Sequence, residues 1–158
     1  MQIEMPSMPM VGLRAAMTYD LARLEGDARV MVFGCDNAAN IEKLRSEGVA
    51  VMSLPCTAML PPSFIEYALY EHQIDGVFIT GCRENDCYNR LGGLWTAQRL
   101  NREREPRLRG RVERKHERVR LFWASATDIK ELAMELESFR SGLRSLNESE
   151  NAAKETIK

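Results

Sequence analysis

Residues 28–35 have the sequence ARVMVFGC, a short and almost continuous apolar run that ends in Gly-Cys. A run of this length without polar alternation is typical of a strand buried on both faces, as in a parallel sheet. Similar runs lie at residues 49–56 and 76–82, which also end in cysteine, and at residues 119–124, which do not. The sequence therefore predicts four short buried strands.

Between and after these runs we expect helices over residues 37–47, 61–72 and 127–143, which have apolar residues at helical spacing, and a long polar helix over about residues 88–104. Strands that alternate with helices predict an α/β fold. The expected architecture is a small parallel four-stranded sheet with flanking helices, flavodoxin- or Rossmann-like, covered on both faces.

The length of 158 residues and the 44% hydrophobic content fit one ordinary domain. We place the α/β domain at residues 28–146. Residues 1–27 form an N-terminal extension in which residues 11–24 predict a short amphipathic helix, a candidate for docking. Residues 147–158 are polar and charged, and we expect a disordered tail there.

The composition also indicates the cellular compartment and the kinds of partner that the protein can bind. No apolar run reaches the roughly 18 residues of a membrane span, and the acidic start lacks the features of a secretory signal, so we expect a cytoplasmic protein. The net charge is −1. Residues 99–120 hold ten Arg or Lys and four Glu, a local net charge of +6, with few aromatics, so we do not expect nucleic-acid binding. The stretch suits a docking face or a solvated surface equally.

The cysteines carry the functional signal. Cys35, Cys56 and Cys82 each stand at the end of a predicted strand, and Cys87 follows in the next loop. Carboxyl ends of parallel strands share one edge of the sheet and lie about 4.8 Å apart, so the four thiols can converge. Disulfides are rare in a reducing compartment, where converging thiolates most often bind metal.

The spacings are C-x20-C, C-x25-C and C-x4-C, without the C-x2-C pairs that zinc sites usually show. This pattern favours a binuclear iron–sulfur cluster over a structural zinc ion. It is also compatible with free buried thiols and with a thiol enzyme that uses Cys82 and Cys87. Gly34 and Gly81 precede two of the cysteines, and we interpret them as positions where the backbone approaches the cofactor.

The segments FGCDN at residues 33–37, LPCT at 54–57 and TGCRENDCY at 80–88 resemble the delta, or iron–sulfur, subunit of methyl-viologen-reducing hydrogenase. The resemblance runs from about residue 29 to 143. The family often has a further cysteine three places after the first, where this chain has Ala38.

The resemblance implies one 2Fe–2S cluster with four cysteine ligands, Cys35, Cys56, Cys82 and Cys87. It also implies electron relay to or from the FAD-containing flavoprotein of a heterodisulfide-reductase-like complex, hydrogenase-linked or sulfur-metabolising. Further iron–sulfur subunits or a hydrogenase are the other partners that it allows. Catalysis would then belong to the assembled complex. The alternative is a non-redox interaction subunit with a structural zinc or free thiols at the same cysteines.

Overall fold

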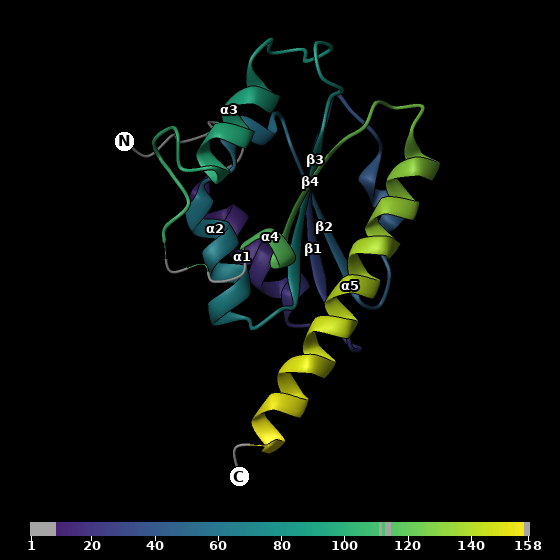
Figure 1. Ribbon diagram of the computed structural model, residues 1–158. Helices are drawn as coiled ribbons and strands as arrows, with labels where there is room; N and C mark the ends of the chain where they lie inside the picture. Colours follow the sequence, from purple (N-terminus) through teal and green to yellow (C-terminus); the bar gives the residue numbers. More distant parts are fainter. Residues whose placement is uncertain (1–8, 111, 113–114, 157–158) are drawn as a thin grey trace.

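A computed structural model describes residues 9–110, 112 and 115–156. Its centre is one all-parallel sheet with the strand order β2-β1-β3-β4 (Figure 1). The strands are β1 (Val30–Cys35), β2 (Val49–Leu54), β3 (Gly76–Gly81) and β4 (Val119–Trp123). All residues of β1 and β3 are buried, which explains their continuous apolar sequences. The predicted α/β fold with a parallel four-stranded sheet is confirmed.

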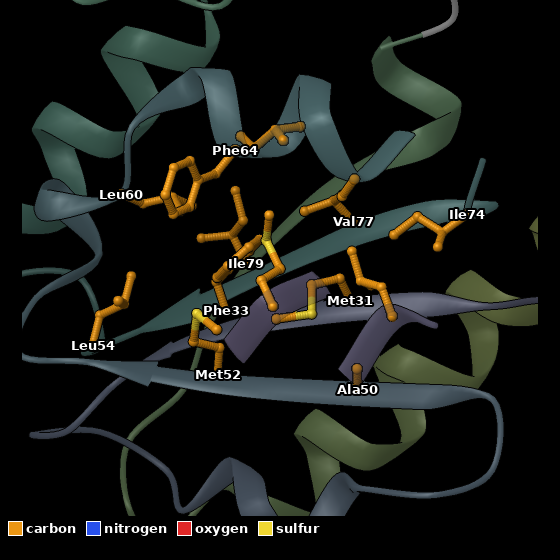
Figure 2. Close-up of a cluster of buried hydrophobic side chains, with 14 of the residues drawn as sticks. Met31, Phe33, Ala50, Met52, Leu54, Leu60, Phe64, Ile74, Val77 and Ile79 are labelled. Atoms are coloured by element: carbon orange, nitrogen blue, oxygen red, sulfur yellow. The ribbon is translucent and has the colours of Figure 1, made fainter. Parts of the chain in front are cut away.

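One face of the sheet is covered by α1 (Met10–Leu21), by α2 (Pro62–Glu66) and by the π-helical turn η3 (Tyr67–Glu71) (Figure 1). Their apolar side chains interdigitate with residues of β1, β2 and β3 in one buried cluster (Figure 2). The helix α3 (Gly92–Leu100) lies near the carboxyl ends of the strands on the same side. This layer therefore supports the edge at which the cysteines stand.

The opposite face packs against the 3₁₀ turn η1 (Ile41–Leu44) and the long helix α5 (Ile129–Thr156). The helix buries one stripe at three- and four-residue spacing, made of Leu132, Leu136, Phe139 and Leu143. The short helix α4 (Lys115–Arg118) leads directly into β4. Across the described part of the chain, no helix has both the length and the apolar composition to cross a membrane.

Three predicted helices are shorter or differently wound than expected. The helix expected over residues 37–47 is only the turn η1, because the backbone is already extended at Arg45 and an antiparallel bridge joins Ser46 to Val49. The segment 61–72 begins as α-helix and widens into the π-turn η3. Residues 88–104 are helical only over α3.

The two ends of the described chain differ from the predicted extension and tail. The α1 residues Leu13 and Met17 are 3% and 0% exposed, in the same cluster as the sheet, so this part of the predicted extension is built into the core. The segment expected as a disordered tail is instead helical as far as Thr156. Residues 1–8 and 157–158 lie outside the described residues.

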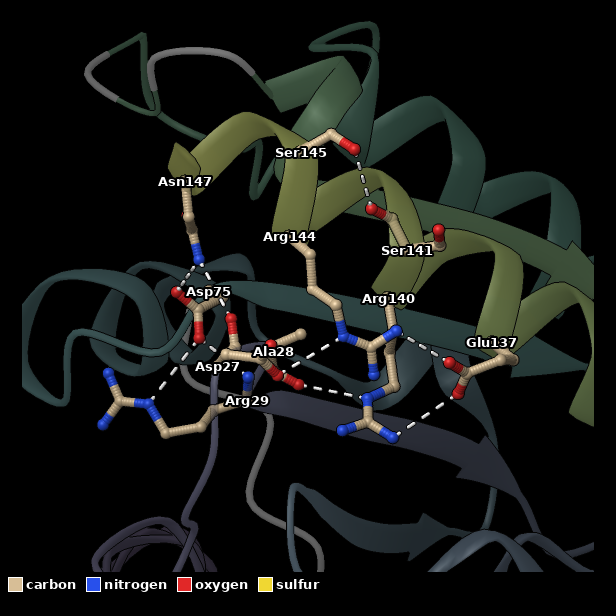
Figure 3. Close-up of polar contacts among 10 residues, drawn as sticks. All are labelled: Asp27, Ala28, Arg29, Asp75, Glu137, Arg140, Ser141, Arg144, Ser145 and Asn147. Carbon is tan, nitrogen blue, oxygen red and sulfur yellow. Dashed lines mark hydrogen bonds and ion pairs between the residues drawn. The ribbon is translucent and has the colours of Figure 1, made fainter. Parts of the chain in front are cut away.

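Polar contacts explain why α5 continues. The Asn147 side chain donates to Asp75 over 2.7 Å, and the Asp75 carboxylate also accepts the backbone N–H of Arg29 over 2.7 Å (Figure 3). Arg118 pairs with Glu150 at 3.0 Å. These contacts tie the polar last turns of α5 to the amino-terminal edge of the sheet.

Candidate metal centre

The four cysteines lie at the carboxyl edge of the sheet, where the sequence predicts them. Cys35 is the last residue of β1, Cys56 comes shortly after β2, and Cys82 follows β3 directly. Cys87 lies in the loop between β3 and α3. Cys35 and Cys56 are buried, the other two are half-buried, and none forms a disulfide. All four thiols are therefore available as ligands.

The strand order brings these thiols together. Because β1 lies between β2 and β3, the crevice beyond the ends of β1 and β3 is the topological switch point where open α/β sheets bind ligands. The Sγ atoms of Cys35 and Cys82 are 3.9 Å apart there. The thiol of Cys82 also interacts with that of Cys87. Three of the thiols thus form a continuous chain of contacts.

Gly92, the first residue of α3, connects the fourth thiol. A Cβ atom at this position would lie 2.5 Å from Sγ of Cys56 and 3.1 Å from Sγ of Cys87. Both sulfurs therefore contact the same backbone position, and only glycine leaves room for them. Gly92 is not among the residues that the sequence pattern indicates for the site.

The pKa values of two thiols are shifted in opposite directions, upward for Cys35 and downward for Cys87. Burial is the largest of the effects that raise the pKa of Cys35 to about 11, and the neighbouring Cys82 and Cys56 act in the same direction. This mutual influence is that of like charges brought close together. A bound metal ion would offset the repulsion between neighbouring thiolates, because metal ions bind cysteine in its deprotonated form.

Cys87 lies in a more favourable environment for a thiolate. Burial acts to raise its pKa, but backbone N–H groups of Gly93, Asn89 and Gly92 donate to the sulfur and lower the pKa overall. Two of these donors belong to the first turn of α3, where unpaired N–H groups stabilise negative charge. The start of this helix is therefore built to face an anionic sulfur.

The separation of the thiols allows a test of metal fit. Two thiolates on one tetrahedral ion with bonds of about 2.3 Å lie about 3.8 Å apart, close to the 3.9 Å between Cys35 and Cys82. Among the described residues, no group of three or more His, Cys, Asp or Glu side chains is arranged to hold a single ion. Cys35 and Cys82 are in contact, and Cys56 and Cys87 both face Gly92. The four thiols together match the number of ligands that a binuclear cluster takes.

One face of α3 covers the turn that follows Cys56. Gly92, Thr96 and Arg99 are spaced by four and three residues, and all three are buried. The Thr96 hydroxyl donates to the Gly92 carbonyl over 2.8 Å and lies 3.2 Å from the hydroxyl of Thr57. The helix face therefore fixes the turn as well as contacting the sulfurs.

Arg99 completes this face. Its side chain donates to the backbone carbonyl of Ala58, two residues after Cys56, and the residue is only 8% exposed. Burial lowers the pKa of Arg99 and the charge of Arg104 adds to this effect, whereas Cys56 opposes it. Within the described residues, Arg99 has no acidic partner, and its Nε has no hydrogen bond.

The turn after Cys82 is held from the other side. Arg83 donates to Asp128 through Nε over 2.6 Å, and Asp128 accepts the Ser125 N–H over 2.7 Å. The Arg83 guanidinium is the main cause that lowers the pKa of Asp128 to about 2, and Ser125 assists. These contacts of Asp128 join the turn after Cys82 to the loop between β4 and α5.

Gly34 and Gly81, predicted to admit the cofactor, have neighbours within the protein. A Cβ at Gly34 would lie 2.7 Å from Ile41, and one at Gly81 would lie 3.1 Å from Trp123. These contacts already account for a small residue at each position. The part that the two glycines play toward a cofactor stays a prediction.

Sequence reasoning missed Gly92, Thr96 and Arg99. The only signal was their four- and three-residue spacing in the segment 92–99, which places them on one helix face. That spacing does not say which face of the helix meets the thiols, and tertiary packing supplies this information.

Apolar side chains surround the half-buried side of the centre. Tyr88, Leu91 and Leu94 are 78%, 44% and 54% exposed, and all follow Cys87 closely in the chain. A groove of about 560 Å³ reaches from Cys56 to Trp95. The edge near the thiols therefore presents apolar surface of the kind found at protein interfaces.

The basic stretch 99–120 is in part engaged within the chain. Arg118 and Arg120 pair with Glu150 and Glu135 of α5, and Arg107 pairs with Glu105. Positions 111 and 113–114 lie outside the described residues. Within the described part of this stretch, Arg99 lines the groove beside Cys56, and Arg104 lies over the Trp95 ring at 4.3 Å.

Comparison with known proteins shows the family. Residues 28–147 match the family described as methyl-viologen-reducing hydrogenase, delta subunit. The chain is also 29% identical over 111 residues to an F420-non-reducing hydrogenase iron-sulfur subunit of Archaeoglobus profundus, an alignment covering 70% of this chain and 79% of that protein. Because the family match spans most of the chain and contains all four cysteines, the protein belongs to the methyl-viologen-reducing hydrogenase delta-subunit family.

Proposed function

We propose that this protein is an electron-transfer subunit that carries one 2Fe–2S cluster, with Cys35, Cys56, Cys82 and Cys87 as ligands. It relays electrons to or from the FAD of a flavoprotein in a heterodisulfide-reductase-like complex. Family membership and the relative named as an iron-sulfur subunit support the electron-transfer role. The cluster type, the ligands and the flavoprotein partner are the proposed part.

The observation that carries the proposal is the convergence of the four thiols at the carboxyl edge of the sheet. Cys35 and Cys82 are separated by the distance expected for two ligands of one tetrahedral ion, and Cys56 and Cys87 both face Gly92. Four thiolates suit a binuclear cluster or a structural zinc ion. The relative named as an iron-sulfur subunit favours the cluster.

When bound, such a cluster accepts and releases single electrons at a potential set by its surroundings. The chain supplies the thiolates, the N–H donors at the start of α3, and burial on the Cys35 and Cys56 side. Cys82 and Cys87 are the less buried ligands and lie beside the exposed Tyr88 and Leu91. This side is where we place electron exchange with the flavoprotein.

Anaerobic purification followed by iron, sulfide and zinc analysis and visible absorption tests the cluster. We expect iron and sulfide in equal amounts, two of each per chain, and charge-transfer bands that bleach on reduction. Zinc without colour would overturn the proposal in favour of the interaction subunit. Turnover by a metal-free chain that requires Cys82 or Cys87 would favour a thiol enzyme.

Single Cys→Ser variants test the ligands. Each of the four is expected to lose or alter the absorption, while Asn89→Ala is expected to retain it. Asn89 is a matched control because it stands in the same loop, its side chain is exposed, and it reaches Cys87 only through its backbone N–H. A full wild-type spectrum in any cysteine variant would remove that residue from the ligand set.

The partner is tested separately by purifying the native assembly through this subunit. We expect a flavoprotein with bound FAD in the purified complex, and reduction of that FAD through the subunit. An assembly without flavin would overturn the partner assignment and leave the cluster assignment intact.

A further inference from the structure

A buried arginine without a counterion lies on the same helix face as the glycine that contacts the thiols. Arg99 is 8% exposed, its Nε has no hydrogen-bond partner, and no acidic side chain of the described residues pairs with it. A guanidinium stays protonated in proteins, so a full positive charge is buried here. Burying such a charge is unfavourable unless an anion compensates it.

Two groups that can carry negative charge line a groove with Arg99, the Cys56 thiol and the Asp36 carboxylate, and Asp36 already accepts a hydrogen bond from the Ser53 hydroxyl. The Arg99 guanidinium donates to the carbonyl of Ala58 in the turn that begins at Cys56. Arg99 and Cys56 line the same groove, and a thiolate at Cys56 would favour the protonated guanidinium. The other cation nearby, Arg104, can only repel it. The buried charge and the turn that carries a predicted ligand are therefore held together.

We propose that Arg99 is a positioning residue whose buried positive charge is the counterion of the metal centre and raises its reduction potential. The inference rests on the proposed function, because it requires an anionic thiolate cluster at Cys35, Cys56, Cys82 and Cys87. One-electron reduction adds negative charge to that centre. A fixed cation in a buried setting therefore stabilises the reduced state more than the oxidised state.

The hydrogen bond to Ala58 gives Arg99 a second, purely structural contribution, and the test must separate the two. Arg99→Gln removes the charge but keeps a donor, and Arg99→Lys keeps the charge but loses the planar fork. Arg102→Gln is a matched control, because Arg102 is an exposed arginine just beyond the end of α3. All three variants and the wild type are compared as iron-loaded protein.

The measurement is a potentiometric titration of the cluster, followed by visible absorption and electron paramagnetic resonance. We expect Arg99→Gln to disfavour reduction at least tenfold, which is about 59 mV more negative for one electron. Arg99→Lys is expected to lie closer to wild type than Arg99→Gln does, and Arg102→Gln to change the equilibrium less than twofold. Equal potentials in wild type and Arg99→Gln would overturn the inference while leaving the cluster itself established.

Thermal unfolding of the metal-free proteins covers the case in which Arg99→Gln does not retain iron. If the charge acts on the centre, the metal-free variant unfolds at a temperature no lower than that of the metal-free wild type. If the metal-free variant fails to fold, or unfolds clearly below the metal-free wild type, Arg99 is only a structural residue and the inference is wrong. A wild-type chain that binds no cluster would instead refute the proposed function.

Discussion

At the residue scale, the space left by Gly92 is the most demanding feature of the site. A methyl group there would lie 2.5 Å from Sγ of Cys56, closer than any normal contact. We expect Gly92→Ala to reduce iron retention severalfold, although alanine favours a helix over glycine by about 1 kcal/mol. Iron content and visible absorption after anaerobic purification provide the measurement.

Gly93 provides the matched control for this substitution. A Cβ at Gly93 would meet its nearest neighbour, Trp123, at an ordinary contact distance of 3.7 Å, and alanine keeps the N–H that donates to Cys87. Gly93→Ala should therefore hold iron as wild type does. Equal iron contents in the two variants would show that the backbone at residue 92 does not limit the site.

The ion pair beside Cys82 predicts a pH effect on stability. Arg83 and Ser125 hold the pKa of Asp128 at about 2, below the roughly 3.9 of an unfolded chain. The ionised carboxylate therefore stabilises the folded state fully above about pH 4, and this contribution is lost as the pH falls toward 2. We expect Asp128→Asn to unfold at lower urea than wild type near neutral pH.

The difference between wild type and Asp128→Asn should shrink over that acidic range, as measured by urea unfolding at a series of pH values. Glu148→Gln, an exposed position on α5, serves as the control and should follow wild type throughout. A stability difference that is the same at every pH would contradict the assigned role of the carboxylate.

Residue by residue, the sequence indicates the ligands better than it indicates what surrounds them. A cysteine at the end of a buried parallel strand has its place fixed by the strand, so Cys35, Cys56 and Cys82 could be located without coordinates. Arg99 could not, because it is one of many arginines in the stretch 99–120. Only the packing of α3 distinguishes this buried arginine from the exposed ones that follow it.

At the element scale, α1 is a part of the core. Met17 is fully buried against the sheet. Truncation of such a side chain removes apolar contact and leaves a cavity, so we expect Met17→Ala to lower the free energy of unfolding by about 2–5 kcal/mol. Val11→Ala is the control, since Val11 is 83% exposed and should change stability by less than about 0.5 kcal/mol. Similar small effects in both variants, measured by urea unfolding, would show that α1 is dispensable.

The strands could be predicted from sequence and the shorter helices could not. A continuous apolar run bounded by Gly or Pro leaves few alternatives to a buried strand, and β2 begins at Val49 as predicted. The segment 37–47 has helical spacing, but Asn40 caps a turn of only four residues before the chain bends into β2. Local hydrogen bonds there override the periodicity. In α5 the opposite holds, because contacts of Asn147 and Glu150 extend a helix beyond its apolar stripe.

At the scale of the whole molecule, the strand order connects the fold to the site. With the order β2-β1-β3-β4, the three strands that end near cysteines are neighbours, and β4, which carries none, is at the edge. The hydrogen bond between Asp75 and Asn147 fixes α5 at the amino-terminal edge of the sheet (Figures 1 and 3). The thiols lie at the opposite, carboxyl edge. The topology therefore accounts for the meeting of Cys35, Cys56 and Cys82, and the loop that leads into α3 brings Cys87 to them.

The most direct test of this account is the Mössbauer spectrum of the anaerobically purified protein loaded with ⁵⁷Fe. Four thiolates that share one binuclear cluster predict two ferric sites with sulfur ligands and a diamagnetic ground state. One-electron reduction should then give one ferric and one ferrous site in equal amounts. A single mononuclear iron site, or the averaged valences of a four-iron cluster, would contradict the account.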